Sequence, residues 1–291
     1  MHHYKELISL LLPVLAASAC GKQPIETEKI PIRIASTLTR ATDSAYEEGD
    51  AVGLYVTLRE GTAAPALKNS GNHADNVSFT LGGGSWAAET PLYWQDDKTH
   101  ADFYCYYPFQ RSVADVRAVP VSVKTDQRGS GYKDSEWLWG TTADVAPTSA
   151  PVSILTRHVL SNLLVVLKPG KGYSEASLAA DVTRITLHSL KVRGTLDLST
   201  GQVTPAGEAA DIIPAEEAGF FRAMVIPQAL DDATLLSVEV GGYTYSMKQT
   251  ITFVANKQHT CTVTVNKTSE GLNIGISDWE TDGNDYGGAI N

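Results

Sequence analysis

The chain has 291 residues, and its formal net charge is −10 at neutral pH. This charge would repel a nucleic acid, so the composition excludes a nucleic-acid-binding protein. Three cysteines are too few for a scaffold held by several disulfides. One bridge between Cys105 and Cys261 remains open, beside the simpler interpretation of two buried thiols.

The N-terminal segment has the anatomy of a secretory signal. An apolar run from Leu7 to Leu15 follows Lys5, and this run is too short to span a bilayer stably. Small residues then lead into Cys20, a pattern typical of a bacterial lipobox, in which the thiol takes a diacylglyceryl group. We therefore predict a lipoprotein signal peptide over residues 1–19 and a membrane anchor on Cys20. The alternatives are a plain secretory signal with an incidental cysteine, or a core helix.

The first predicted strand begins after a short polar linker over residues 20–29. Ile30, Ile32 and Ile34 alternate with other residues, which is the period-2 pattern of a strand with one buried face. Pro31 has no amide proton to donate to a neighbouring strand. We therefore expect this first strand at the edge of a sheet.

The rest of the sequence predicts short strands separated by turns. A polar loop over residues 39–44 precedes a second strand over 51–58. Helical periodicity is nearly absent, and the best short candidate covers residues 174–180. Further strands are predicted over 76–81, 102–108, 119–123, 159–167, 185–190, 192–198, 220–226, 235–240, 243–247 and 261–265.

These elements predict an all-β protein with two β-sandwich domains. The stretch Pro147–Pro151 has linker chemistry, so we place the domain boundary just after it, near residue 155. The N-terminal sandwich is then expected over residues 30–155. The C-terminal sandwich is expected over residues 156–291.

Several segments carry a resemblance to a known family. They are Thr-Arg-Ala-Thr-Asp at 39–43, Glu-Glu-Gly-Asp at 47–50, Val-Gly-Leu-Tyr-Val at 52–56, Leu-Tyr-Trp at 92–94, Ala-Asp-Phe-Tyr-Cys-Tyr-Tyr-Pro at 101–108 and Arg-His-Val-Leu-Ser-Asn-Leu at 157–163. Their order and spacing resemble the Mfa-like fimbrillins of Bacteroides-type bacteria. The resemblance implies two tandem transthyretin-like, Greek-key β-sandwich domains. It also implies a pilus subunit or a related adhesin at the surface of the outer membrane.

The resemblance further implies maturation by a trypsin-like protease with arginine specificity. In such proteins the cut follows an arginine in the loop after the first strand. Arg40 occupies that place, so we predict cleavage between Arg40 and Ala41, with Arg33 as the second choice. The alternative is that Arg40 is an ordinary exposed charge of the loop.

A strand near the C-terminus is the candidate donor for assembly. Leu272, Ile274 and Ile276 form the same period-2 stripe as Ile30, Ile32 and Ile34 in the first strand. A groove left by the first strand could accept any strand of like parity, because main-chain bonds supply affinity and alternate side chains supply specificity. The alternative is that 272–276 is simply the last strand of its own domain.

No residue pattern for catalysis or metal binding stands out. The histidines show no pair at a zinc spacing, and no Gly-x-Ser-x-Gly elbow occurs. The tail from Asp278 to Gly283 matches the first half of a calcium loop, but Ala289 stands where the bidentate glutamate belongs. We therefore expect no enzymatic activity, no metal and no cofactor.

Two hypotheses for function remain. The first is a fimbrial structural subunit that is exported as a lipoprotein and polymerises with copies of itself or related subunits. The second is a permanently anchored outer-membrane lipoprotein, either a pilus anchor or an adhesin for a glycan or a host protein. They differ in whether the first strand leaves its groove.

Overall fold

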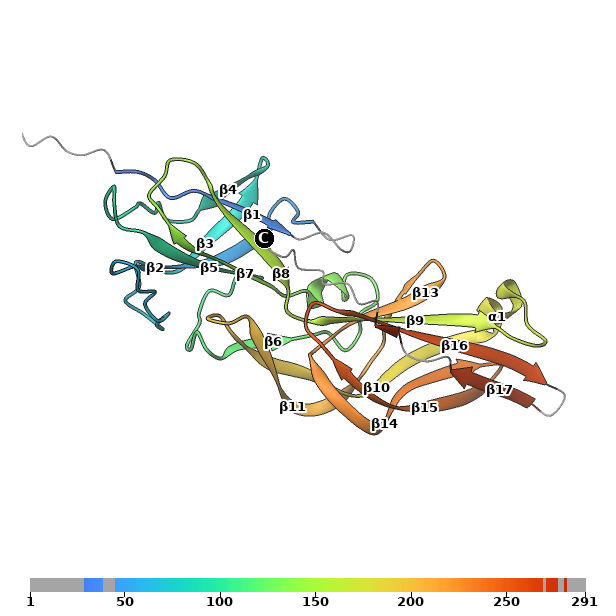
Figure 1. Ribbon diagram of the computed structural model, residues 1–291. Coiled ribbons are helices and arrows are strands. Elements are labelled where there is room, and N and C mark those ends of the chain that lie inside the picture. Colours follow the sequence, from blue (N-terminus) through green and yellow to red (C-terminus); the bar gives the residue numbers. More distant parts are fainter. Residues whose placement is uncertain (1–28, 39–44, 269–270, 277–279, 282–291) are drawn as a thin grey trace, which may run out of the picture.

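The computed structural model describes residues 29–38, 45–268, 271–276 and 280–281. These residues form a nearly all-β protein, which confirms the predicted fold class. Figure 1 shows one sheet in the blue-to-green half of the chain and two further sheets in the yellow-to-red half. In the part of the chain that the structure describes, no helix is long and apolar enough to cross a membrane.

The first half of the chain builds a seven-stranded sheet. Its strand β1 pairs in parallel with β8, whereas the other neighbours are antiparallel. The two ends of the strand order approach each other, since Trp86 Nε1 on β4 donates a hydrogen bond of 3.3 Å to the Ser36 carbonyl on β1. The order is β1 (Ile34–Leu38), β8 (Val152–His158), β7 (Leu138–Val145), β5 (Ala101–Tyr107), β2 (Ala51–Leu58), β3 (Ala74–Gly82) and β4 (Ser85–Ala88).

Alternate residues of these strands give the seven-stranded sheet an apolar core on one face. Val52, Leu54 and Val56 of β2 are fully buried there, together with Phe103 and Cys105 of β5. The opposite face of β5 carries tyrosines that pack against a second and larger core. Both faces of this central strand are therefore covered by protein.

The second half of the chain forms two sheets that share this larger core. Their inner side chains interleave, so the two sheets pack as a sandwich. One sheet has the order β11 (Gln202–Ile212), β10 (Val182–Asp197), β14 (Gln228–Val240), β15 (Tyr243–Phe253). The other has the order β12 (Ala215–Glu217), β13 (Phe220–Val225), β9 (Ser161–Pro169), β16 (Gln258–Thr268), β17 (Gly271–Ile276), and β18 (Glu280–Thr281) pairs with β16.

The one α-helix of the described residues, α1 (Glu175–Asp181), lies where the sequence favours helix. It begins after Ser174, whose hydroxyl accepts a hydrogen bond from the Ser177 amide and so satisfies one free donor of the first turn. A single turn of 3₁₀-helix, Lys133–Ser135, is the other helical element there. The prediction of a short helix at 174–180 is confirmed.

The segment between β5 and β7 leaves the first sheet and packs on the second half. Its strand β6 (Val119–Ser122) pairs antiparallel with residues 193–196 of β10, and Figure 1 shows β6 next to the sheets of the second half. Farther on, the Gln127 side chain makes two hydrogen bonds with the backbone of Met224, at 2.7 and 2.8 Å. Strand β6 lies before the predicted boundary near residue 155, but it belongs to the sheet of the second half.

The passage between the halves is short and buried. β8 ends at His158 and β9 begins at Ser161, with Val159 and Leu160 only 1% and 2% exposed between them. The predicted boundary near residue 155 falls inside β8, and the proline-rich stretch 147–151 joins β7 to β8 within one sheet. The division into two tandem transthyretin-like domains at 155 and 156 stays an interpretation of the sequence.

Candidate functional site

The first strand lies at the edge of its sheet, as Pro31 indicates. Ile30 is half-buried and Ile32 and Ile34 are each 4% exposed, so all three face the core of the seven-stranded sheet. Before β1 begins, the Ile32 amide donates to the Leu92 carbonyl at 2.8 Å. Within β1, main-chain pairing is with β8 alone. The strand therefore buries a row of isoleucines while it has one hydrogen-bonded neighbour strand.

A cluster of three hydroxyl groups lies beneath the C-terminal end of β1. Ser36 Oγ donates to the Tyr46 hydroxyl at 3.3 Å, and the Tyr46 hydroxyl is 2.9 Å from Thr156 Oγ1 on β8. Thr156 Oγ1 also donates to the Thr37 carbonyl at 3.1 Å. We call Ser36, Tyr46 and Thr156 the hydroxyl cluster. It lies at one end of a row of inward positions whose other members, Ile30, Ile32 and Ile34, are apolar.

Tyr46 packs against the core of the seven-stranded sheet. Its ring meets Trp86 edge-on at a centroid distance of 5.0 Å and Tyr107 at 5.7 Å. Burial raises the pKa of Tyr46 well above its usual range, so its hydroxyl stays protonated and can donate. Tyr46 follows the loop over 39–44 in sequence, so a cut in that loop would leave Tyr46 with the body of the protein and Ser36 with the released strand.

The two cysteines of the described chain are free thiols in different cores, so the interpretation of two buried thiols is confirmed. Cys105 lies under β1 beside the Ser36 hydroxyl, and burial raises the pKa of its thiol to about 12. Burial likewise raises the pKa of Cys261 in the second half to about 12. Since the thiolate is the nucleophile, the raised pKa leads us to expect that both thiols react slowly while the chain is folded.

The other residues of the predicted processing site are placed only in part. Cys20, Arg40 and Ala41 lie outside the described residues. Arg33 is exposed, but its carbonyl accepts a hydrogen bond of 2.8 Å from the Val152 amide. This hydrogen bond has to break before a protease can bind the chain and cut after Arg33. The pairing therefore favours a cleavage site other than Arg33.

The candidate donor strand is β17. It pairs antiparallel with β16, with Ile276 opposite Val263, Ile274 opposite Val265 and Leu272 opposite Lys267. This places β17 at the end of the strand order in the six-stranded sheet, where β16 is its neighbouring strand. The backbone pairing agrees with a last strand of its own sheet and leaves the donor role a prediction.

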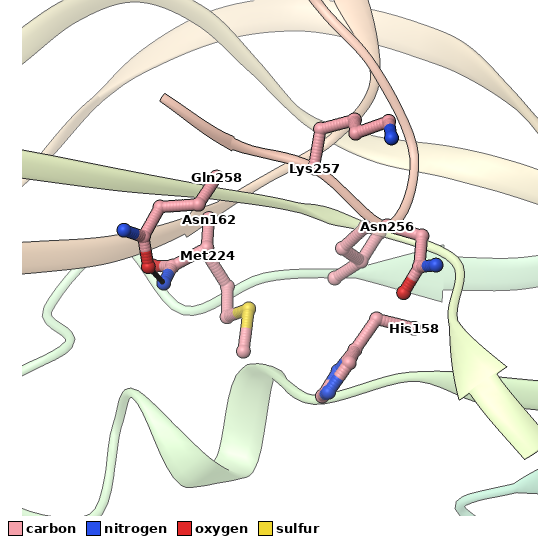
Figure 2. A pocket seen from close by; sticks show the side chains of 7 residues that line it. His158, Asn162, Met224, Asn256, Lys257 and Gln258 are labelled. Carbon is pink, nitrogen blue, oxygen red and sulfur yellow. Dashed lines mark hydrogen bonds between the residues drawn. The ribbon is translucent and has the colours of Figure 1, made fainter. Parts of the chain in front are cut away.

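A water-sized cavity marks the buried passage between the halves. Its volume is about 20 Å³, enough for about one water molecule. Figure 2 shows His158 and Asn256 on one side and the Asn162 amide donating to Gln258 Oε1 at 3.1 Å on the other. His158 is 9% exposed, and its Nδ1 lies 3.4 Å from Glu136.

Acidification should destabilise this passage through His158. Burial lowers the pKa of His158 from 6.5 to about 4, despite the nearby Glu136 carboxylate. Between pH 6.5 and pH 4, His158 is therefore protonated in the unfolded chain but neutral in the folded chain. The folded state has its full stability above pH 6.5, and its free energy of unfolding decreases as the pH falls through this range. We expect a loss on the order of 3 kcal/mol. Urea unfolding at pH 7 and pH 4.5 measures it, and an unchanged pH slope in His158→Gln would contradict the assignment.

Sequence reasoning missed an Asp–His–Ser arrangement on the five-stranded sheet. His188 Nδ1 lies 2.8 Å from Asp211 on β11, and its Nε2 lies 2.8 Å from Ser237 Oγ on β14. These three side chains come from adjacent strands and are remote in sequence, so no motif could reveal them. Ser237 is paired with β10 on one side and β15 on the other, so its strand's amides serve the ladders rather than an oxyanion hole. We interpret the arrangement as structural: the His188 side chain links β11 and β14 by hydrogen bonds across β10.

A hollow of the described surface lies beneath α1 at the end of the second half. It has a volume of about 560 Å³ and combines Phe220, Phe221 and Leu178 with Arg184 and Glu217. This size and mixture suit a small ligand or a side chain of a partner. Among the described residues, no group of three or more potential metal ligands is present there or elsewhere.

Comparisons with known proteins agree with the all-β architecture. The chain is 27% identical over 265 residues to a Bacteroides uniformis protein that carries the name fimbrium subunit Fim1C, with 86% of this chain and 83% of that protein covered. A crystal structure from Bacteroides ovatus, described as a cell adhesion protein, has a TM-score of 0.66 at 19% identity and covers 88% of this chain and 98% of its own. The tip fimbrial protein Mfa3 from Porphyromonas gingivalis, with a C-terminal truncation, has a TM-score of 0.51 at 10% identity and covers 87% and 100%.

The structural likeness carries the fold alone at these identities. The family model described as fimbrillin-like matches residues 39–279, which is most of the chain. It takes in β2 to β17 and the loop that contains Arg40. The chain belongs to the fimbrillin-like family.

Proposed function

We propose that this protein is a structural subunit of a cell-surface fimbria that polymerises when a strand of another copy replaces β1. The observation that carries the proposal is the position of β1 in the sheet. Within Ile34–Leu38 it pairs with β8 alone, it buries Ile34 next to the buried Ile32 that precedes it, and the loop with Arg40 follows it. A strand that takes the place of β1 can make the same kind of main-chain bonds with β8 and the same kind of apolar contacts. The exchange of one strand for another is therefore nearly balanced in free energy.

Delivery and anchoring follow from the N-terminal segment in this proposal. The precursor is exported, acylated on Cys20 and held at the outer-membrane surface, where an arginine-specific protease cuts after Arg40. The cut separates the lipid-bearing end and β1 from the rest of the chain. Its partners are then other copies of itself or related pilus subunits.

Cleavage after Arg40 is expected to give one discrete product. An arginine-specific protease acting on the chain from Cys20 onward should cut at 40–41 because this loop joins β1 to Tyr46, whereas Arg33 is paired with β8 through its own carbonyl. Intact mass spectrometry identifies the product. The Arg40→Gln variant should lose it, and the matched Arg33→Gln variant should retain it; a product that persists in Arg40→Gln would contradict the assignment.

A second candidate function is recognition of a receptor by a permanently anchored lipoprotein. The hollow beneath α1, with its mixed apolar and charged lining, is the observation that favours it. In that case β1 remains in place after exposure to the protease, and the receptor is a glycan or a host protein. Retention of β1 in protease-treated protein separates this candidate from the first.

A further inference from the structure

Another hollow of the described surface lies where the two halves of the chain meet. Its volume is about 380 Å³, which is within the range of sites that bind small molecules. One wall is the end of β8 with Arg157 and His158, and another is the start of β11 with Gln202. The turn between β15 and β16 adds Asn256 and Lys257. Figure 2 shows His158, Asn256 and Lys257, which this hollow shares with the water-sized cavity.

The lining of this hollow is positively charged, although the whole chain has a net charge of −10. Arg157 and Lys257 are its cations, and none of the described residues that line it is an aspartate or a glutamate. His158 stays neutral at pH 7, since burial lowers its pKa to about 4. The Glu136 carboxylate near His158 is buried and lies outside the lining. Cations gathered in a hollow of an acidic protein attract an anion to this place.

The Arg157 guanidinium is positioned to bind such an anion. Its Cζ lies 5.2 Å from the centroid of the Trp139 ring, which covers one face of the guanidinium. The Trp139 ring is itself held by its hydrogen bond to the Leu198 carbonyl. Among the described residues, Arg157 forms no ion pair with a carboxylate. A guanidinium that is stacked in this way can donate two parallel hydrogen bonds from its edge to a carboxylate.

The rest of the lining suits a compact ligand that also carries hydroxyl groups. The Gln202 side chain is exposed, and its amide can both donate to and accept from a hydroxyl. Pro227 and Val254 add apolar surface, and Val254 is 46% exposed. Apolar surface of this kind can pack against the C–H groups of a sugar ring, so the lining combines the contacts that a sugar acid needs.

We propose that this hollow binds a sugar that carries a carboxylate, such as a uronic acid unit of a glycan, with Arg157 paired to the carboxylate. In this assignment Gln202 bonds a hydroxyl of the sugar, and Lys257 adds a second positive charge. The site is separate from the hollow beneath α1. It goes beyond the proposed assembly function, and its use does not depend on the release of β1.

A pair of matched sugars tests the assignment on the chain from residue 20 to 291. Methyl β-D-glucuronoside carries a carboxylate, and methyl β-D-glucoside has a hydroxymethyl group in its place. Titrations followed by ligand-detected NMR should show that the glucoside binds at least about 10-fold more weakly, because it cannot form the charge-assisted hydrogen bonds. Raising the salt concentration from about 50 mM to about 500 mM should weaken binding of the glucuronoside.

Matched variants identify the site. Gln202→Glu places a negative charge in the hollow and should weaken glucuronoside binding by about 10-fold, whereas Gln202→Lys should bind at least as tightly as the unaltered chain. Both changes are at an exposed side chain, so the fold should be kept. Arg157→Gln should also weaken binding by about 10-fold. Arg184→Gln changes the net charge equally but lies in the hollow beneath α1, and it should stay within about twofold.

Three results would overturn the proposal. Equal binding of the two sugars, or binding of neither, would show that the hollow does not select a carboxylated sugar. Equal weakening by Arg157→Gln and Arg184→Gln would show a response to net charge and no site at Arg157. Tighter binding of the acidic peptide acetyl-Gly-Glu-Gly-amide than of the glucuronoside would assign the hollow to a protein partner. None of these results bears on strand exchange, so the two proposals fail separately.

Discussion

Replacing Ile34 by alanine should speed labelling of Cys105 in the folded protein by about 100-fold. Ile34 is 4% exposed and packs in the core that contains Cys105, which lies under β1. Truncation of a buried isoleucine to alanine costs roughly 2–5 kcal/mol, and about 2.7 kcal/mol corresponds to a 100-fold rise in the open population. Because β1 is an edge strand, this cost should fall on its local opening rather than on the whole fold.

The measurement is the rate of thiol labelling at pH 8, read for each cysteine by peptide mass. Cys261 is the internal reference, since it is buried in the second core and has the same raised pKa of about 12. Arg33→Ala is the matched variant on the exposed side of the strand, and it should leave the Cys105 rate within about threefold. Equal acceleration of Cys105 and Cys261 would mean global unfolding and would contradict independent release of β1.

Replacing Trp139 by alanine should lower the free energy of unfolding by about 3–5 kcal/mol. Trp139 lies on β7 in the first sheet, yet its Nε1 donates to the Leu198 carbonyl of the second half at 2.8 Å. Its ring covers Gly201, where an added Cβ would lie 2.4 Å from the ring, and the Arg157 guanidinium stacks 5.2 Å from its centroid. One side chain therefore joins the two halves by packing and by a hydrogen bond.

Urea unfolding with far-ultraviolet circular dichroism measures this loss. Trp139→Phe is the matched control, because it keeps most of the ring contact and loses the indole donor; we expect a loss of about 1–2 kcal/mol. In Trp139→Ala the two halves should also unfold in separate transitions, since their link is weakened. A single transition with a loss below 1 kcal/mol would show that Trp139 does not couple the halves.

The sequence predicted the fold class and the first strand because both depend on local patterns. Alternation of Ile30, Ile32 and Ile34 is a property of neighbouring residues, and Pro31 limits where such a strand can pair. The helical candidate at residues 174–180 was predicted from local periodicity in the same way. Each of these features is decided within a few residues of where it is seen.

The contacts that join the halves could not be predicted, because they depend on residues far apart in the chain. Nothing in the local sequence around Gln127 indicates that its side chain bonds the backbone of Met224. The local sequence of β6 likewise predicts a strand but not its pairing with β10. The proline-rich stretch at 147–151 has the composition of a linker, but hairpin loops share that composition.

The hydroxyl cluster is hidden from the sequence for a similar reason. Ser36 and Tyr46 are ten residues apart, but Thr156 comes from a strand more than a hundred residues later. Ser36 continues the alternation of Ile30, Ile32 and Ile34, so the sequence alone predicts that its side chain faces inward. Why an inward serine is tolerated there becomes clear only once the parallel pairing of β1 with β8 is known.

A reversible lock on β1 tests the central claim most directly. Ala35 and Ser153 face each other in the register of β1 with β8, on the side away from the hydroxyl cluster. Cysteines at both positions, in a chain with Cys20→Ser, should form a disulfide that holds β1 after the loop is cut. The quantity to measure is filament formation by cut protein, seen by negative-stain microscopy, with and without a reducing agent.

The account predicts that the oxidised and cut variant stays monomeric with β1 attached, and that reduction releases β1 and starts assembly. Single-cysteine variants at Ala35 and at Ser153 should assemble under both conditions. Filaments that form equally fast from the oxidised, cut double variant would contradict the claim that β1 has to leave before subunits join.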